Sequence, residues 1–256
     1  MHSSLDLEGG RALVTGGSGA IGAAVVEELA CSGVDVVVGY GSDEAGAASA
    51  VERAEDHGVD ALAVQTDVTD EEAVEQLVER AADSGDLRVL VTCAGVTDPH
   101  SISEVTRDAL ERVLSVNVTG TALVAREAVK HMRTSAGGDG GAVVAVSSVA
   151  ADLGTVDTTY ATAKGGIESF VRALSRELGH EDVRANVVSP GLVDTPMNDA
   201  IIEHLEKQRF RGHETVDTLL DRYEATPAEV AAAVRFLVEH GFITGEVLHV
   251  DSGMSL

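Results

Sequence analysis

Short apolar runs alternate with amphipathic segments of helical period along the whole chain, and this alternation limits the fold more than any other feature. The apolar runs have the length of buried strands, and the amphipathic segments are long enough to be helices. Strands that are separated by helices run parallel and are covered on both faces. We therefore expect an α/β fold with a seven-stranded, parallel, doubly wound sheet. The predicted strands are 11–15, 34–39, 60–70 (ending in a turn), 88–95, 141–148, 183–191 and 246–251, and the predicted helices are 20–33, 43–57, 70–83, 106–133, 158–179, polar segments within 198–224, and 227–239.

Length and composition fit a single domain. The chain has 256 residues, of which 44% are apolar, enough for one large domain with a buried core. The glycine-rich stretch at 135–141 predicts a surface turn, not a domain boundary. No apolar run is long enough to span a membrane, and the N-terminus lacks the apolar centre of a signal peptide, so we expect a cytoplasmic protein with no membrane partner. The two cysteines, Cys31 and Cys93, predict neither a disulfide framework nor a metal site.

The charge of the chain is strongly negative. A net charge of −25 and the absence of Trp argue against a nucleic-acid partner. Such a surface repels itself at low salt and is screened at high salt. Two interpretations stay open, a protein adapted to high salt and an ordinary acidic protein of the cytosol.

A glycine-rich loop at 14–22 joins the first predicted strand to the first predicted helix. Glycines there let the backbone turn tightly and approach a pyrophosphate, whose charge the helix N-terminus attracts. The loop can be aligned with G-x-G-x-x-G through Gly17, Gly19 and Gly22. Its position between a buried strand and a helix favours a dinucleotide-binding loop over a plain strand–helix turn, and therefore a Rossmann fold.

The same loop resembles the TGxxxGxG fingerprint of the short-chain dehydrogenases/reductases, with Ala20 where the middle glycine of the fingerprint stands. The resemblance implies a single Rossmann domain that binds a nicotinamide cofactor. The loop residues that it implies as cofactor contacts are Gly16, Ser18, Gly19, Ile21 and Gly22.

The choice between the two nicotinamide cofactors depends on the end of the second predicted strand. An acid there hydrogen-bonds the adenosine ribose and repels a 2′-phosphate. No acid stands at 39–42, and the hydroxyls of Tyr40 and Ser42 fit NADP(H). No Arg or Lys is nearby, and Asp43 follows at once. We expect NADP(H) as the preferred cofactor, with NAD(H) as the alternative.

Two more segments resemble cofactor-binding motifs of the family. In the segment at 66–70, Asp67 and Val68 correspond to the residues that meet the adenine ring, although Asp67 alone would read as a helix-capping turn residue. In the segment at 92–95, Ala94 and Gly95 match the family's NNAG motif. Thr92 and Cys93 replace its two asparagines, and we expect Cys93 to be a packing residue.

Tyr160 and Lys164 are four residues apart, which places both side chains on one face of a helix. The pair could be ordinary helix residues. It also has the composition of a proton-transfer pair, because a nearby ammonium and an oxidised nicotinamide favour the phenolate and bring the pKa of Tyr160 toward working pH. The resemblance implies this second role, with Lys164 also holding the nicotinamide ribose. We expect no metal in the site.

Two further catalytic residues are implied by the resemblance. The serine that orients the substrate carbonyl is Ser148 by motif, whereas Ser147 has the usual spacing of 13 residues to Tyr160. We predict Ser148 on the motif match, which implies a one-residue deletion in the loop before Tyr160. Strand alternation should point the two hydroxyls to opposite faces, so only one of them should serve. Asn117 matches the helix asparagine whose distorted backbone holds a proton-relay water; taken alone, it would be a tolerated polar residue.

The segment after the sixth predicted strand resembles the family's Pro-Gly motif. Pro190 and Gly191 break the strand, and Val193 and Thr195 should contact the nicotinamide carboxamide. The following residues, about 196–226, should form a helical lid that selects the substrate. The lid carries the densest basic patch of the chain, at 203–214, which either attracts an anionic substrate or is a solvated helix face.

These motifs together predict an NAD(P)-dependent oxidoreductase that interconverts a carbonyl and a secondary alcohol. The resemblance to 3-oxoacyl-thioester reductases favours a ketoreductase for such a thioester or a similar ketone. The acidic segment at 179–183 argues against an acyl-carrier-protein substrate. Sugar or polyol dehydrogenation is the alternative, and a catalytically idle cofactor-binding regulator is less favoured because Tyr160 and Lys164 are both present. The resemblance also implies a homotetramer.

Overall fold

Seven strands form one parallel sheet in the order β3-β2-β1-β4-β5-β6-β7. This order confirms the predicted doubly wound sheet. The computed structural model describes residues 9–83, 85–155, 157–198 and 218–256. The strands are β1 (Gly10–Thr15), β2 (Asp35–Tyr40), β3 (Ala61–Gln65), β4 (Asp86–Thr92), β5 (Gly141–Val146), β6 (Val183–Pro190) and β7 (Val247–Val250).

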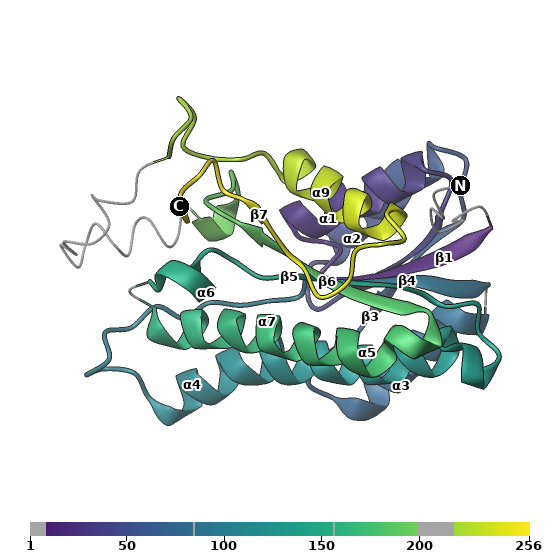
Figure 1. Cartoon of the computed structure of the whole chain (residues 1–256), viewed down its shortest axis with the longest axis horizontal. Coiled ribbons are helices and arrows are strands. Elements are labelled where there is room, and N and C mark those ends of the chain that lie inside the picture. Colours follow the sequence, from purple (N-terminus) through teal and green to yellow (C-terminus); the bar gives the residue numbers. More distant parts are fainter. Residues whose placement is uncertain (1–8, 84, 156, 199–217) are drawn as a thin grey trace.

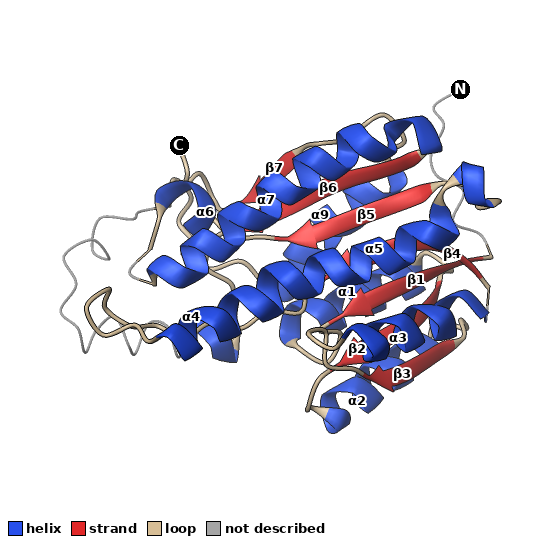
Figure 2. Cartoon of the chain, turned by 90° about the horizontal axis from the view of Figure 1, so that it is seen from below, coloured by secondary structure: helices blue, strands red, loops and turns tan. Residues whose placement is uncertain are grey.

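Helices cover both faces of the sheet. In Figure 1, α1, α2 and α9 lie above the sheet and α3, α5 and α7 lie below it, and Figure 2 shows the lower set side by side across the strands. Among the described residues, the helices are α1 (Ala20–Cys31), α2 (Glu44–Glu55), α3 (Glu71–Asp83), α4 (Arg107–Leu114), the π-helix η1 (Ser115–Gly120), α5 (Thr121–Met132), the short 3-10 helix η2 (Thr134–Ala136), α6 (Ala150–Leu153), α7 (Thr158–Leu178), the 3-10 helix η3 (Gly179–Glu181) and α9 (Pro227–Glu239).

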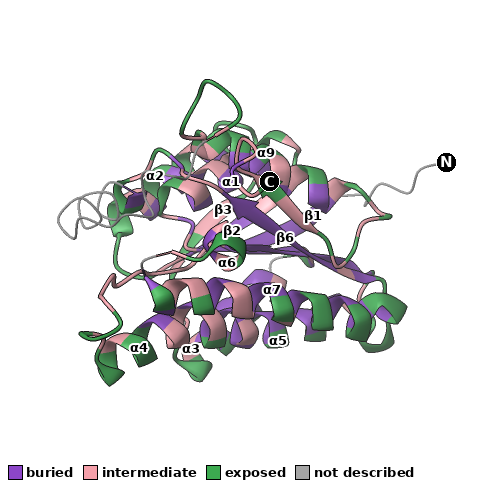
Figure 3. Cartoon of the chain, turned by 60° about the vertical axis from the view of Figure 1, so that its left-hand side comes forward, coloured by how far each residue is buried: buried purple, intermediate pink, exposed green. Residues whose placement is uncertain are grey.

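The core consists of two layers, one on each face of the sheet. Because side chains alternate along a strand, Ala12 and Val14 lie between the sheet and the helices α1, α2 and α9. Leu13 lies on the opposite face, between the sheet and the helices α3, α5 and α7. All six residues of β1 are buried, and Figure 3 shows the buried colour concentrated on the central strands. Burying a Val or Leu side chain contributes about 1.5–3 kcal/mol, so these layers hold the strand ends in place.

The strand order reverses between β1 and β4, which are neighbours in the sheet although β2 and β3 separate them in the chain. The connections leave the sheet in opposite directions at this point, so a crevice opens at the carboxyl ends of the strands. The segments that carry the predicted motifs follow β1, β4, β5 and β6, and all reach this end of the sheet.

Three features of the chain path differ from the expectation. The predicted helix at 106–133 is not one continuous α-helix, because the π-turn η1 separates α4 from α5 at the place where a distorted backbone was expected for Asn117. The short helix α6, which was not predicted, follows β5. The predicted lid falls largely on residues 199–217, outside the described residues. The described part of the lid at 196–198 is helical, as expected. The described part at 218–224 forms bends instead of the expected helix, held by the bond from the Leu219 N–H to the Ser252 carbonyl oxygen (2.8 Å). No helix in the described part of the chain is long and apolar enough to cross a membrane.

Candidate active site

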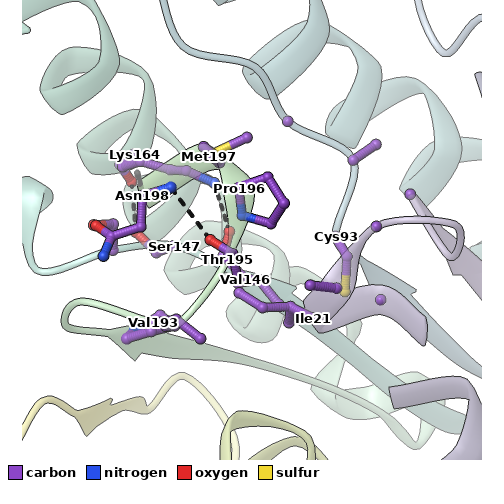
Figure 4. Close-up of a pocket in the computed structure, with 18 of the residues that line it drawn as sticks. Ile21, Cys93, Val146, Ser147, Lys164, Val193, Thr195, Pro196, Met197 and Asn198 are labelled. Atoms are coloured by element: carbon purple, nitrogen blue, oxygen red, sulfur yellow. Dashed lines mark hydrogen bonds between the residues drawn. The ribbon is translucent and has the colours of Figure 1, made fainter. Parts of the chain in front are cut away.

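A cleft of about 530 Å³ opens at the carboxyl ends of the central strands. Its walls are the glycine-rich loop after β1, the ends of β4 and β5, helix α7, and the segment after β6. Figure 4 shows Lys164 and Ser147 on one side of this space and Ile21 and Cys93 on the other. The predicted site residues that line the cleft are Gly16, Ser18, Gly19, Ile21, Gly22, Ala94, Gly95, Ser148, Tyr160, Lys164, Pro190, Gly191, Val193 and Thr195.

The glycine-rich loop leaves no room for side chains. A Cβ on Gly22 would lie 2.2 Å from the Gly16 carbonyl oxygen. Gly16 has a φ of +66°, and a Cβ there would lie 2.6 Å from the Ala94 nitrogen. The backbone is therefore exposed to the cleft at a close approach that side chains would block.

Helix α1 begins at this loop without a side-chain cap and has no acid in its first turn. The side chains of Asp43, Asp70, Thr106, Asp157 and Thr226 cap α2, α3, α4, α7 and α9. Helices α5, which continues from η1, and α6, which has four residues, also lack a side-chain cap. The uncapped N-terminus of α1 lies at the glycine-rich loop that lines the cleft, where free N–H groups favour an anion. This arrangement fits the pyrophosphate of a dinucleotide.

The adenosine side of the predicted site is less complete. Tyr40 packs against the core layer under α1 and α2, and Ser42 is exposed. Asp43 lines the cleft instead, and its carboxylate accepts a hydrogen bond from the Gly46 N–H (2.9 Å). Asp43 was not predicted as a lining residue, although it directly follows Ser42, which was predicted to contact the cofactor.

Asp67 and Val68 also lie outside the cleft lining. The Asp67 carboxylate accepts bonds from the N–H (2.9 Å) and hydroxyl (2.7 Å) of Thr69, and these bonds hold its pKa below the ordinary value. This is the local turn geometry that the residue types alone would suggest. Val68 lies directly beside Gly120 of η1, where an added Cβ would meet its side chain at 2.7 Å. Their predicted contacts with adenine stay predictions.

The two candidate serines point to different partners. The Ser147 hydroxyl is buried and donates to the Lys164 carbonyl oxygen (3.2 Å) and to Glu168 Oε1 (3.1 Å). The Ser148 hydroxyl accepts a hydrogen bond from the Ala150 N–H (3.2 Å), lines the cleft together with Tyr160, and lies close enough to the Tyr160 phenol to lower its pKa. Of the pair, Ser148 is therefore the hydroxyl beside Tyr160, and Ser147 is tied to the inner face of α7.

Tyr160 has a high pKa in this site. Burial of its phenol is the main cause that raises the pKa to about 12; the Ser148 hydroxyl opposes this rise, and the charge of Asp157 adds to it. The expectation was that the neighbouring ammonium and an oxidised nicotinamide would lower it. Lys164 Nζ lies 5.4 Å from the centre of the Tyr160 ring and donates to the Val146 carbonyl oxygen (2.8 Å). In the chain by itself, desolvation is the larger effect.

Lys164 is almost completely buried at 5% exposure. Burial lowers its pKa to about 8, with the Cys93 thiol as an opposing influence. Burial also raises the pKa of Cys93 to about 12, so this thiol stays protonated at neutral pH and is a packing residue, as expected.

Asn117 lies in the π-turn η1, which is the backbone distortion expected there. Its amide nitrogen donates to the carbonyl oxygens of Val96 (2.9 Å) and Val113 (2.8 Å), and its Oδ1 has no partner among the described residues. A Cβ on Gly95 would lie 2.7 Å from this Oδ1 and 3.6 Å from Lys164 Nζ. The space kept free by Gly95 thus joins the asparagine oxygen to the lysine ammonium, as a relay water requires.

The segment after β6 forms the remaining wall. The Gly191 N–H donates to the Val250 carbonyl oxygen (3.0 Å), and Val193 pairs with Ala225 in an isolated bridge. Thr195 lines the cleft, and its hydroxyl accepts from the Asn198 N–H (3.3 Å). Four lining residues were not predicted as part of the site, namely Ala20, Asp43, Val146 and Leu192. The lining also contains Cys93 and the alternative serine Ser147, as well as Pro196, Met197 and Asn198 at the start of the predicted lid. The described residues contain no group of three side chains that could hold a metal ion.

The fold and the cleft define a dinucleotide-binding oxidoreductase with a Tyr–Lys pair, and comparisons with known proteins agree. A family model described as enoyl-(acyl carrier protein) reductase matches residues 16–255. The cis-4-hydroxycyclohexanecarboxylate dehydrogenase of Sinomonas cyclohexanicum is 38% identical over 94% of this chain and 95% of that protein. The 3-oxoacyl-acyl-carrier-protein reductase FabG of Aquifex aeolicus is 35% identical over 98% of this chain and 99% of that protein.

A solved structure also matches closely. The short-chain dehydrogenase of Burkholderia cenocepacia in complex with NADP has a TM-score of 0.86 and 34% identity, covering 98% of this chain and 99% of that one. The chain belongs to the short-chain dehydrogenase/reductase family. It is an oxidoreductase that acts on CH–OH groups with a nicotinamide cofactor, as the sequence predicted.

Proposed function

We propose that this protein is a ketoreductase, which reduces a ketone to a secondary alcohol with Tyr160 as the acid. The observation that carries the proposal is that Ser148, Tyr160 and Lys164 line one cleft, with the Ser148 hydroxyl close enough to the Tyr160 phenol to lower its pKa. Two hydroxyls that meet in this way can hold one carbonyl oxygen between them.

The chain's own residues account for the proton chemistry. The bound cofactor supplies the hydride in reduction and accepts it in oxidation. Ser148 orients the carbonyl, and Tyr160 donates its proton to the oxygen as negative charge develops there. Lys164 and Asn117 return a proton to Tyr160 through a water held at the free Oδ1. A Lys164 pKa of about 8 leaves the amine able to gain and lose a proton near neutral pH.

We propose a 3-oxoacyl thioester or a similar ketone as the substrate. The similarity to a 3-oxoacyl-acyl-carrier-protein reductase supports it. In the acidic segment after α7, the Glu181 carboxylate is buried against the N–H (2.9 Å) and hydroxyl (2.7 Å) of Ser135. Its neighbour Asp182 is exposed, so this surface presents an acid that an acidic carrier protein would avoid. A coenzyme A thioester or a free ketone is therefore favoured over a carrier-bound substrate.

Oxidation of a polyol or another secondary alcohol is the second candidate. The similarity to a dehydrogenase of a hydroxycyclohexanecarboxylate favours it. Cofactor turnover with a panel of β-keto thioesters, diketones and polyols separates the two, and turnover with polyols alone would overturn the ketoreductase assignment. An idle regulator fits less well, because Tyr160, Lys164 and Ser148 are brought together.

We propose NADP(H) as the preferred cofactor. No acid stands at residues 39–42, and the Asp43 carboxylate is turned to the N-terminus of α2, whose dipole offsets part of its charge. The related structure from Burkholderia cenocepacia holds NADP. We expect kcat/KM to be higher with NADPH than with NADH; a clear preference for NADH would contradict the proposal.

We also propose a homotetramer in the cytoplasm. Exposed apolar side chains at the C-terminal end, Phe236, Phe242 and Leu256, support one interface on α9 and β7, and the outer faces of α5 and α7 supply the other. Light scattering in dilute buffer tests the assembly, and a monomeric mass would overturn it.

Replacement of Tyr160 by Phe tests the central assignment. The variant keeps the ring and loses the acidic proton, so we expect kcat to fall by about 10²–10⁴-fold while cofactor affinity is retained. Ser148→Ala should also lower kcat strongly, whereas Ser147→Ala should mainly lower stability because Glu168 loses a bond. Near-normal kcat in Tyr160→Phe would rule out the proposed mechanism.

A further inference from the structure

Asp157 is attached to the backbone of Tyr160 itself. It is the N-cap of α7, and its Oδ1 accepts a hydrogen bond from the Tyr160 N–H (3.0 Å). Its Oδ2 accepts a second bond from the Thr97 hydroxyl (2.7 Å), and the residue is only 5% exposed. One carboxylate therefore joins the start of the Tyr160 helix to the loop after β4.

Among the described residues, no Lys, Arg or His forms an ion pair with the Asp157 carboxylate, whose hydrogen-bond donors are Thr97 and the Tyr160 N–H. Arg112, the basic residue near the same loop, forms an ion pair with Asp98 (3.1 Å) and donates to the Thr97 carbonyl oxygen (3.4 Å). The Asp157 carboxylate is thus balanced only by its two hydrogen-bond donors and by the N-terminus of α7. A buried charge that is screened so weakly acts on neighbouring groups.

We propose that Asp157 is a positioning residue that fixes the start of the Tyr160 helix and, through its negative charge, holds the Tyr160 phenol in its protonated form, which favours reduction over oxidation. The inference rests on the proposed function in one respect, namely that Tyr160 is the acid–base group. It adds to that function a reason why the enzyme favours reduction over oxidation.

The two directions need opposite forms of the phenol. In reduction, hydride bonds to the carbonyl carbon, the C=O π bond breaks, and the phenol O–H breaks as its proton moves to the oxygen. In oxidation the alcohol O–H breaks, the proton moves to the phenolate, and hydride leaves carbon for the oxidised cofactor. A group that disfavours phenolate therefore slows oxidation at a given pH and leaves reduction active to higher pH.

The electrostatics of the site agree with this. Burial is the main cause that raises the pKa of Tyr160 to about 12, and the Asp157 charge acts in the same direction. Lys164, with a pKa of about 8, loses its proton first, so above that pH it no longer favours phenolate. The titratable or charged groups near Tyr160 and Asp157 include Lys164 and Glu168 on α7, Cys93, Asp98 and His100 after β4, Arg112 on α4, Asp152 on α6, and His249 on β7.

A titration of the full chain tests the proposal without a substrate. The chain has three Tyr and no Trp, so tyrosinate formation can be followed by near-ultraviolet absorbance, and subtraction of Tyr160→Phe isolates Tyr160. Asp157→Asn and Asp157→Ser both remove the charge and keep a cap for the Tyr160 N–H. We expect Tyr160 to ionise about 0.5–1 pH unit lower in both variants.

Asp152→Asn is the matched control. Asp152 is an acid on neighbouring α6, half exposed and paired with His249 (2.9 Å), and its neutralisation should leave the Tyr160 titration where it is. An unchanged titration in Asp157→Asn and Asp157→Ser, or an equal shift in the control, overturns the proposal. For oxidation below the pKa, a shift of one unit raises the phenolate fraction and the rate about tenfold at fixed pH.

The outcomes separate this inference from the proposed function. If Tyr160→Phe keeps its reductase activity, Tyr160 is not the acid and the proposed function fails. The proposed effect of Asp157 on the direction of the reaction then fails as well. If Tyr160→Phe is inactive, the proposed function stands. If, in addition, Tyr160 in the Asp157 variants ionises at the wild-type pH and these variants oxidise an alcohol at the wild-type rate, the role of Asp157 is refuted.

Discussion

At the scale of single residues, Lys164 is a buried cation whose presence opposes folding. Its pKa of about 8 lies below the ordinary 10.5, so the unfolded chain binds a proton in this window that the folded chain lacks. Stability from this group is therefore present above pH 10.5 and is lost as pH falls toward 8. We expect Lys164→Met to be more stable than wild type by about 1–2 kcal/mol at pH 7, after allowing for the lost bond to the Val146 carbonyl oxygen.

Urea denaturation at several pH values measures this difference. The gap between Lys164→Met and wild type should shrink as pH rises from 8 to 10.5, and the variant should be inactive throughout. Lys130→Met is the control, because its ammonium is half exposed and paired with Glu127. A Lys164→Met protein that is less stable than wild type at pH 7 would show that burial of this charge does not lower the free energy of unfolding.

Residue types and spacing predicted the Tyr–Lys pair but could not decide the serine by geometry. Strand β5 ends at Val146, so strand alternation no longer fixes the directions of the two hydroxyls that follow. The deciding contact is Glu168, which holds Ser147 and was not assigned from the sequence. The signal was available, because Glu168 follows Lys164 by one helical turn and so lies on the buried face of α7.

At the scale of elements, the loop between β1 and α1 depends on glycine for its shape. In Gly22→Ala the added Cβ would lie 2.2 Å from the Gly16 carbonyl oxygen, so the loop must move. We expect cofactor affinity, measured by fluorescence or calorimetric titration, to fall more than tenfold and Tm to decrease. Gly179→Ala, where nothing lies within 4 Å of the added Cβ, should change neither. Equal cofactor affinity in both variants would mean that this loop does not bind the pyrophosphate.

Elements were predictable where the hydrophobic pattern repeats over many residues. All seven strands were predicted from apolar runs. The inner strands, such as β1 and β5, are buried on both faces and so are mostly apolar, whereas the edge strands β3 and β7 are partly exposed and carry Gln65 and His249. The π-turn at Ser115–Gly120 was not predicted as an element, since one additional residue in a helical turn barely changes the period. The four-residue helix α6 was missed because it is too short to show any period.

At the scale of the whole molecule, the excess of acids over bases sets how stability depends on salt. The chain has 43 acids and 18 Lys and Arg residues, so 25 acids would lack a partner even if every cation formed an ion pair. The ion pairs at the surface, such as Arg107–Glu111, contribute little. Repulsion between the unpaired acids therefore outweighs the attraction within these pairs, and it acts against the compact state.

Salt should consequently stabilise this protein. Between about 0.01 M and 1 M NaCl the screening length falls from about 30 Å to about 3 Å, so we expect Tm to rise over this range, whereas loss of ion pairs alone would lower it. Glu79→Lys gives a matched variant on the exposed face of α3, where it replaces a like-charge neighbour of Glu75 by an attractive one. This variant should be more stable than wild type at low salt and less dependent on added salt. A Tm that is already maximal in dilute buffer would favour the ordinary acidic protein over one adapted to high salt, because the fold would then tolerate its net charge of −25 without screening.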